Sequence, residues 1–226
     1  ITLLSGFLGA GKTTLLNRIL NEHHGKRYAV IVNEFAEEGI ENDLIIGADE
    51  EILEMNNGCI CCTIRGDLIL SLSKLIERNK DLDGVIIEST GLANPAPIIQ
   101  IFLSEQSVNY FIKLDAIVAV ADAFHIDRQL VDYHETREQI AFADVILVNK
   151  IDLLKPGGLE KVIAKIKNIN PEAKLIKTVN CDAPIEELLN IDAFNLDHML
   201  GLNQLPVKAD HKHLHNSDIK SVSLIS

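Results

Sequence analysis

A glycine-rich segment near the start of the chain constrains its fold more than any other feature. The segment Gly6-Phe7-Leu8-Gly9-Ala10-Gly11-Lys12-Thr13 lies between a short apolar run and a stretch typical of a helix. A buried strand, a glycine loop and a helix in this order are the context that a phosphate-binding P-loop requires. Glycines let successive backbone N–H groups turn toward an anion, which then also lies at the positive end of the helix. Because Lys12 can reach the β- and γ-phosphates and the Thr13 hydroxyl can hold Mg²⁺, the segment predicts a nucleoside triphosphate site.

The composition argues against two other classes of function. Of the 226 residues 47% are hydrophobic, enough for a continuous core. No apolar run approaches the ~18–20 residues of a membrane-spanning helix, so we expect no membrane association. The 33 acidic and 21 basic residues give a net charge of −12, and no cluster of Lys and Arg offers a patch for a phosphate backbone. We therefore expect no nucleic-acid partner.

Apolar runs alternate with helical patterns along most of the chain. The runs are nearly continuous in Val, Ile, Leu and Ala, which is typical of parallel strands covered on both faces. The runs cover 1–4, 28–32, 85–88, 117–121, 145–148 and 175–178, and the helical patterns cover 14–22, 64–78, 126–142, 159–168 and 185–189. This alternation predicts a three-layer α/β P-loop NTPase domain with a mostly parallel central sheet. Ligands of such sheets bind beyond the carboxyl ends of the strands.

Three regions are expected along the chain. The P-loop domain is expected to occupy 1–200, and a polar linker over 201–217 carries His211, His213 and His215. These alternating histidines either collect a metal weakly or are solvated. Residues 218–226 alternate apolar and polar side chains like a strand, so we interpret them as the start of a truncated C-terminal domain.

The tetrapeptide Asn149-Lys150-Ile151-Asp152 follows the apolar run 145–148. At the end of a strand in a P-loop fold, the Asp152 carboxylate can accept hydrogen bonds from guanine N1–H and from the 2-amino group. Adenine lacks this pair of donors and would leave the carboxylate unpaired. Asn149 would brace the loop, and the Lys150 stem would pack over the base. The tetrapeptide therefore predicts guanine specificity.

Acidic residues also follow other apolar runs. Glu88 ends the run 85–88, where its carboxylate can hold the Mg²⁺ shell or orient the attacking water, and the Gly91 N–H can sense the γ-phosphate. Asp122 is interpreted instead as the N-cap of the helix that follows it. Glu37 lies in the segment 33–39, which is either a nucleotide-sensing switch loop or a solvated acidic loop.

Three of the four cysteines are clustered as Cys59, Cys61 and Cys62. In extended backbone the first two thiols face the same side, and the third lies where a helix is expected to begin. Thiolates prefer Zn²⁺ or Cu(I) to Mg²⁺ or Ca²⁺, and three sulfurs leave one position for Glu37, a histidine or a transfer partner. The cluster predicts metal binding in a reducing, cytoplasmic compartment. The fourth, Cys181, is expected to be a small buried residue, unless its loop directs a backbone N–H at guanine O6.

Together these segments resemble the CobW-like family of metallochaperone GTPases, which includes cobalamin-synthesis proteins, nitrile-hydratase activators and zinc-regulated GTPase chaperones. The likeness rests on the P-loop with Thr14, on Asn33-Glu34-Phe35, on Asn57-Gly58-Cys59-Ile60-Cys61-Cys62, on Glu88-Ser89-Thr90-Gly91 with Asn94-Pro95, and on Asn149-Lys150-Ile151-Asp152. Ala36 departs from it, since relatives often have glycine there. The nucleotide-binding residues that the resemblance implies are Gly9, Ala10, Gly11, Lys12, Thr13, Thr14, Gly91, Asn149, Lys150 and Asp152.

The family implies a cycle in which GTP and Mg²⁺ order the switch loops, Zn²⁺ or Co²⁺ occupies the cysteines, and hydrolysis passes the ion to a client protein. Catalysis falls to Lys12, Thr13 and Glu88. Without an evident arginine finger or positioned Gln, hydrolysis by the chain alone should be slow, of order 10⁻⁴ to 10⁻² s⁻¹. The alternative is a zinc store or sensor in which nucleotide only modulates metal affinity or the formation of a homodimer. The lack of an Arg-rich lid disfavours a small-molecule kinase.

Overall fold

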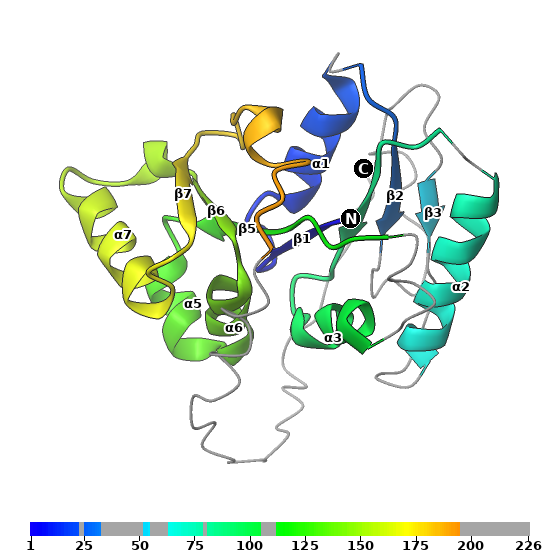
Figure 1. The fold of residues 1–226 in the computed structure, drawn as a ribbon. Coiled ribbons are helices and arrows are strands. Elements are labelled where there is room, and N and C mark those ends of the chain that lie inside the picture. Colours follow the sequence, from blue (N-terminus) through cyan, green and yellow to red (C-terminus); the bar gives the residue numbers. More distant parts are fainter. Residues whose placement is uncertain (23–24, 33–51, 55–62, 79–80, 105–111, 195–226) are drawn as a thin grey trace, which may run out of the picture. The chain divides into compact units, whose positions relative to one another are not determined.

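The chain forms a single parallel sheet in the part of the molecule that the computed structural model describes, residues 1–22, 25–32, 52–54, 63–78, 81–104 and 112–194. The seven strands of this sheet have the order β3-β2-β4-β1-β5-β6-β7 (Figure 1). They are β1 (Thr2–Gly6), β2 (Tyr28–Val32), β3 (Ile52–Glu54), β4 (Gly84–Glu88), β5 (Ala116–Asp122), β6 (Val145–Asn149) and β7 (Lys174–Lys177). The helices are α1 (Lys12–Asn21), α2 (Thr63–Arg78), α3 (Ala96–Ser104), α5 (Ile126–Asp132), α6 (His134–Phe142) and α7 (Gly158–Ile169), with 3₁₀ turns η1 (Ile151–Leu153) and η2 (Ile185–Glu187).

The central strand β1 marks the point at which the strand order reverses. It pairs in parallel with β4 on one side and with β5 on the other. The strands β2, β3 and β4 lie on the first side of it, and the later strands extend the sheet on the second side. In open α/β sheets ligands bind outside the carboxyl ends of the strands at such a switch point. The topology therefore directs attention to the loop after β1.

Strand side chains alternate between two apolar layers, as the pleat of a strand requires. On one face Val118 and Leu147 belong to a buried cluster that includes the apolar side of α1 and residues after β7. On the other face Ala119 and Ile146 pack with residues of α5, α6 and α7. All seven residues of β5 are buried. Burying each Leu or Ile stabilises the fold by about 1.5–3 kcal/mol, and the predicted three-layer α/β domain is confirmed.

The six strands predicted from apolar runs are all present as β1, β2, β4, β5, β6 and β7. The sequence did not reveal β3, a three-residue strand that pairs only with β2 among the described strands. It also did not reveal α3, whose residues Ile98, Ile99, Ile101 and Phe102 are all buried. Apart from Gln100, the residues from 97 to 103 form a nearly continuous apolar run, and periodicity alone does not distinguish such a run from a buried strand. The helix predicted at 185–189 is instead the single 3₁₀ turn η2.

The helix predicted over 126–142 is wrong in its continuity. It is divided into α5 and α6 at Tyr133, whose φ of −132° and ψ of 119° are those of extended backbone. The Tyr133 ring packs on the Phe7 ring of the glycine-rich loop, with centroids 4.5 Å apart and planes inclined by 42°. This tertiary contact accompanies the break, and no local helix signal marks its position.

Residues 1–194 form one compact unit, and the chain from 195 onward lies outside the described residues. The predicted linker over 201–217, its three histidines and the strand expected in 218–226 fall in that part, so these expectations stay predictions. Among the helices of the described ranges, none is both long and apolar enough to cross a membrane.

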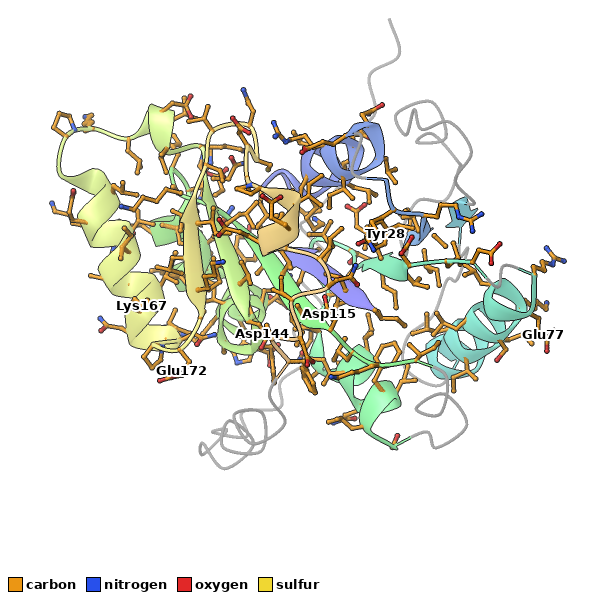
Figure 2. The ribbon with its side chains drawn as sticks, turned by 45° about the horizontal axis from the view of Figure 1, so that its top comes forward. Tyr28, Glu77, Asp115, Asp144, Lys167 and Glu172 are labelled. Carbon is orange, nitrogen blue, oxygen red and sulfur yellow. The ribbon has the colours of Figure 1, made fainter. Side chains whose placement is uncertain are left out.

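Two carboxylates, Asp115 and Asp144, lie at the sheet edge opposite the glycine-rich loop, directly before β5 and β6 (Figure 2). Asp115 Oδ1 accepts a hydrogen bond of 2.6 Å from Asp192 N and thereby fixes the end of the compact unit to the sheet. Asp144 Oδ2 accepts one of 2.7 Å from Ile117 N. Burial raises the pKa of Asp144 to about 7, the Ile117 N–H opposes this shift, and the Asp115 charge adds to it.

This raised pKa predicts that the fold loses stability as the pH rises toward 7. The carboxyl of Asp144 ionises near 3.8 when unfolded and near 7 when folded, so the proton favours the folded state. The free energy of unfolding should therefore fall by roughly 2 kcal/mol between pH 5 and pH 8 through this group alone. We expect Asp144→Asn, which keeps an acceptor for Ile117 N, to reduce that fall in urea titrations at both pH values. The exposed Glu172 offers the control Glu172→Gln, and an Asp144→Asn chain with the wild-type pH dependence would contradict the assignment.

Candidate nucleotide-binding site

The glycine-rich loop is held in a conformation that requires glycine at two positions. Gly9 and Gly11 have φ values of 71° and 117°, in the left-handed region that glycine adopts most readily. A Cβ atom on Gly11 would lie 2.7 Å from Asn149 Nδ2 and 2.9 Å from Cys181 Sγ, so no larger residue fits. The helix α1 begins at Lys12, and its described first turn has neither a capping side chain nor an acidic residue. The unpaired N–H groups and positive end of this helix favour an anion.

The predicted catalytic side chains gather beside this loop. Lys12 is buried, and its Nζ lies 3.5 Å from the Phe7 carbonyl oxygen. The Thr13 hydroxyl donates to Glu88 Oε1 at 3.4 Å, which brings the end of β4 against the start of α1. A hydroxyl and a carboxylate are the oxygen ligands that Mg²⁺ accepts, so this pair fits the predicted ion. Thr14, the next residue of α1, is exposed.

The segment after β4 lies directly against the glycine-rich loop. Ser89 N donates to the Leu4 carbonyl oxygen at 2.9 Å, which continues the pairing of β4 with β1. A Cβ atom on Gly91 would lie 2.7 Å from Leu8 N, so the two backbones approach as closely as glycine allows. The structure thus brings Gly91 against the glycine-rich loop.

The tetrapeptide at the end of β6 is joined to the glycine-rich loop by two side chains. Asn149 is 2% exposed, and its Nδ2 donates to the Ala10 carbonyl oxygen at 3.0 Å. Lys150 has a φ of 63°, and its Nζ donates to the Gly9 carbonyl oxygen at 2.6 Å. Asp152 lies on η1 with its side chain exposed, where an incoming base can reach it.

The prediction that Asp122 is the N-cap of the following helix is wrong, because His125 holds that position in α5. Asp122 Oδ1 accepts hydrogen bonds from Phe124 N at 3.0 Å and His125 N at 3.1 Å, so it caps the turn before α5. Its Oδ2 also accepts from Lys150 Nζ at 2.7 Å and contacts His125 Nδ1 at 3.0 Å. Burial by itself would raise the pKa of Asp122, but the hydrogen bonds from Lys150 and His125 outweigh it and hold that pKa below its usual value. Sequence reasoning missed the contact with Lys150; the adjacent strand ends of Asp122 and Asn149 are the signal that could have revealed it.

Cys181 is fully buried behind the glycine-rich loop, in agreement with the first of its two interpretations. Its N–H donates to Asn149 Oδ1 at 2.9 Å, and its thiol donates to the Gly11 carbonyl oxygen at 3.3 Å. Burial raises the pKa of the Cys181 thiol to about 11, although Arg18 and Lys150 oppose the shift. This cysteine is therefore a packing residue and an unreactive one, because the thiolate is the reactive form.

The predicted metal ligands Cys59, Cys61, Cys62 and Glu37 lie outside the described residues. Among the residues that are described, no three His, Cys, Asp or Glu side chains come together as a metal-binding group. The metal site therefore stays a prediction from the sequence.

The strand, glycine-rich loop and uncapped helix, joined to an Asn-Lys-x-Asp tetrapeptide on a parallel sheet, define a P-loop nucleotide-binding protein. Residues 1–177 match the family model described as CobW/HypB/UreG, nucleotide-binding domain. The chain belongs to this family.

Relatives and solved structures agree with this assignment. The zinc chaperone YjiA of Escherichia coli is 39% identical over 201 residues, covering 87% of this chain and 63% of the relative. The zinc-regulated GTPase metalloprotein activator 1 of Dictyostelium discoideum is 38% identical over 232 residues, covering 86% of this chain and 49% of the relative. The crystal structure of Zn(II)-bound YjiA GTPase from E. coli superposes with a TM-score of 0.68 at 35% identity, covering 86% of this chain and 62% of that one. The chain thus spans only part of the length of the relatives it matches.

The buried Asn149 side chain should be needed for stability of the site. Its Oδ1 accepts from Thr178 Oγ1 at 3.1 Å and from Cys181 N, and its Nδ2 holds the Ala10 carbonyl. Asn149→Ala leaves these groups unpaired, and we expect it to lower the free energy of unfolding by about 3 kcal/mol. Thermal and urea denaturation would measure the loss, with Asn168→Ala on the exposed side of α7 as the control. Equal stability of the two variants would refute this role.

Proposed function

We propose that this chain is the nucleotide-binding part of a GTP-hydrolysing metallochaperone, which couples its nucleotide state to the binding and delivery of zinc. The observation that carries the proposal is the joining of three functional groups at one sheet edge. The phosphate-type loop contacts the guanine-type tetrapeptide through Asn149 and Lys150, and Thr13 of the same loop segment donates to Glu88. Each group alone occurs in other settings, whereas their combination serves a guanine nucleoside triphosphate.

The phosphates would lie on the N–H groups of the glycine-rich loop, with Lys12 beside the β- and γ-phosphates. This local positive potential is needed because the chain carries a net charge of −12. Thr13 and Glu88 would hold Mg²⁺, which when bound neutralises charge on the phosphate oxygens. Glu88 alternatively orients the water whose oxygen bonds to the γ-phosphorus while the bond to the β–γ bridging oxygen breaks. The proton that the water loses passes to a γ-phosphate oxygen or to the Glu88 carboxylate, and the products are GDP and inorganic phosphate, formed slowly by the chain alone.

The zinc part of the proposal is supported by the relatives and by the cysteines. The E. coli relative is named a zinc chaperone, the Dictyostelium relative a zinc-regulated GTPase metalloprotein activator, and the solved YjiA structure holds Zn(II). In this chain Cys59, Cys61 and Cys62, with Glu37 as the fourth ligand, offer soft thiolates suited to zinc, and Co²⁺ can use the same ligands. Zinc is here the cargo, and a metal-requiring cytoplasmic client protein is its destination. A homodimer that depends on nucleotide or metal is compatible with this cycle.

Coupling between the two ligands is the first test of this function. We expect the Zn²⁺ affinity, measured by chelator competition, to differ about tenfold or more between the GDP-loaded chain and the chain loaded with a non-hydrolysable GTP analogue. Cys61→Ser should abolish the difference, since it removes a thiolate from the proposed site. Linkage requires that zinc change the ratio of nucleotide affinities by the same factor, which provides an internal check. Equal zinc affinities would contradict the coupling and would favour the second candidate in its other form, a zinc store or sensor in which nucleotide affects only the formation of a homodimer.

Guanine recognition makes a separate prediction for Asp152. Asp152→Asn replaces one carboxylate oxygen by an amide donor, which no longer matches guanine but matches the 2-carbonyl of xanthine. We expect GTP affinity to fall about 100-fold or more, because the new amide donor faces a guanine donor and both are left without an acceptor. Xanthosine triphosphate affinity should rise, because the 2-carbonyl of xanthine accepts from the same amide. Titration of fluorescent nucleotides would measure both affinities, with exposed Asp127→Asn on α5 as the matched control. A variant that keeps the wild-type preference would exclude Asp152 from base recognition.

A further inference from the structure

A small cavity lies behind the glycine-rich loop, between the ends of β1 and β5 and the helices α5 and α6. Its volume is about 10 Å³, and its lining includes Phe7 of the loop and the polar residues Gln129, Thr136 and Gln139. These three polar side chains are 7%, 3% and 2% exposed. A space of this size holds a single water molecule.

Each polar residue of this cavity has an oxygen atom without a hydrogen bond. Among the described residues, Gln129 Oε1, Thr136 Oγ1 and Gln139 Oε1 are buried and have no partner. Buried polar atoms are nearly always paired, either with protein or with ordered water. A water molecule can donate to the two amide oxygens and accept a hydrogen bond from the Thr136 hydroxyl, which gives the three bonds typical of buried water. Two other occupants fit less well. A cation would exchange most of its hydration shell for only three oxygen ligands, and an apolar ligand would leave all three oxygens without a hydrogen bond.

The other end of the Gln139 amide holds the segment that contacts the glycine-rich loop. Gln139 Nε2 donates to the Gly91 carbonyl oxygen at 3.2 Å and to the Ala93 carbonyl oxygen at 3.1 Å. Because both partners are acceptors, the amide nitrogen must face them and the amide oxygen must face the cavity. The amide therefore links α6 to the residue that packs against Leu8 of the loop.

We propose that the cavity binds one water molecule and that Gln139, fixed by this water, is a positioning residue for Gly91. The side chain holds the Gly91 backbone against the glycine-rich loop, in the arrangement that meets a γ-phosphate. The water donates a hydrogen bond to Gln139 Oε1. The side chain then gains no hydrogen bond by turning away from Gly91. The inference rests on the proposed function in one respect, the contact between the Gly91 N–H and the γ-phosphate of GTP.

The test compares nucleotides with and without a γ-phosphate, because a merely structural role would affect both alike. In Gln139→Met the side chain keeps its length and loses both hydrogen bonds to the segment after β4, those to the carbonyl oxygens of Gly91 and Ala93. We expect its affinity for a non-hydrolysable GTP analogue to fall about tenfold, while its GDP affinity stays within about twofold of wild type. The control is Asn170→Ala, because Asn170 is a buried amide that holds the carbonyls of Ile140, Ala141 and Ala143 at the other end of α6. It should lower the melting temperature and leave the ratio of the two affinities unchanged.

A second pair of variants tests the water and remains informative if Gln139→Met fails to fold. Thr136→Val keeps the side-chain shape without the hydroxyl, and we expect it to weaken the GTP analogue about threefold and to spare GDP. Thr136→Ser keeps the hydroxyl and should match wild type. A high-resolution crystal structure should show one water bonded to the three oxygens in wild type.

Four results would decide against the inference. Equal losses for both nucleotides in Gln139→Met, or a changed affinity ratio in Asn170→Ala, would overturn the positioning role while leaving the proposed function intact. Wild-type affinities in Thr136→Val would overturn the role of the water. A wild-type chain that binds neither guanine nucleotide would instead refute the proposed function and the positioning role with it.

Discussion

The hydrogen bonds of the buried Asn149 side chain are the interaction on which the site depends. One amide connects the glycine-rich loop, the end of β6 and the loop after β7, through Ala10, Thr178 and Cys181. The segments meet inside the protein, where an unpaired group costs about 1–3 kcal/mol. They are therefore held as a unit, and the phosphate and base halves of a nucleotide would meet a preformed surface. The absence of a Cβ on Gly11 is what allows the amide to approach.

The electrostatic potential at the glycine-rich loop is set by nearby groups and not by the net charge of the chain. The chain carries a net charge of −12, yet the loop presents the N-terminus of α1 and the Lys12 side chain. The nearest buried carboxylate on the base side, Asp122, is paired with Lys150 and contacts His125. Pairing keeps that charge from repelling an anion and simultaneously directs Lys150 to the Gly9 carbonyl.

Helices on one face of the sheet reach the phosphate end of the site by two contacts. Tyr133, at the break between α5 and α6, packs on Phe7 of the loop. Gln139, on α6, holds the carbonyls of Gly91 and Ala93. A displacement of the Gly91 segment would therefore also shift α6, because a densely packed interior transmits such movements. This gives a physical route from the nucleotide to the helical layer.

The sequence by itself determined the strand, loop and helix around Lys12 and six of the strands, and it predicted the roles of Glu88, Asn149, Lys150 and Asp152. These follow from local apolar runs and from residue types at fixed spacing, which need no knowledge of distant partners. Tertiary structure alone decided the break at Tyr133, the pairing of Asp122 with Lys150, and the hold of Gln139 on Gly91. Each of these depends on which strands and helices become neighbours, and in the case of Gln139 the two residues are 48 positions apart in the chain. Contacts of that kind arise from the strand order around β1, and a local pattern carries no record of them.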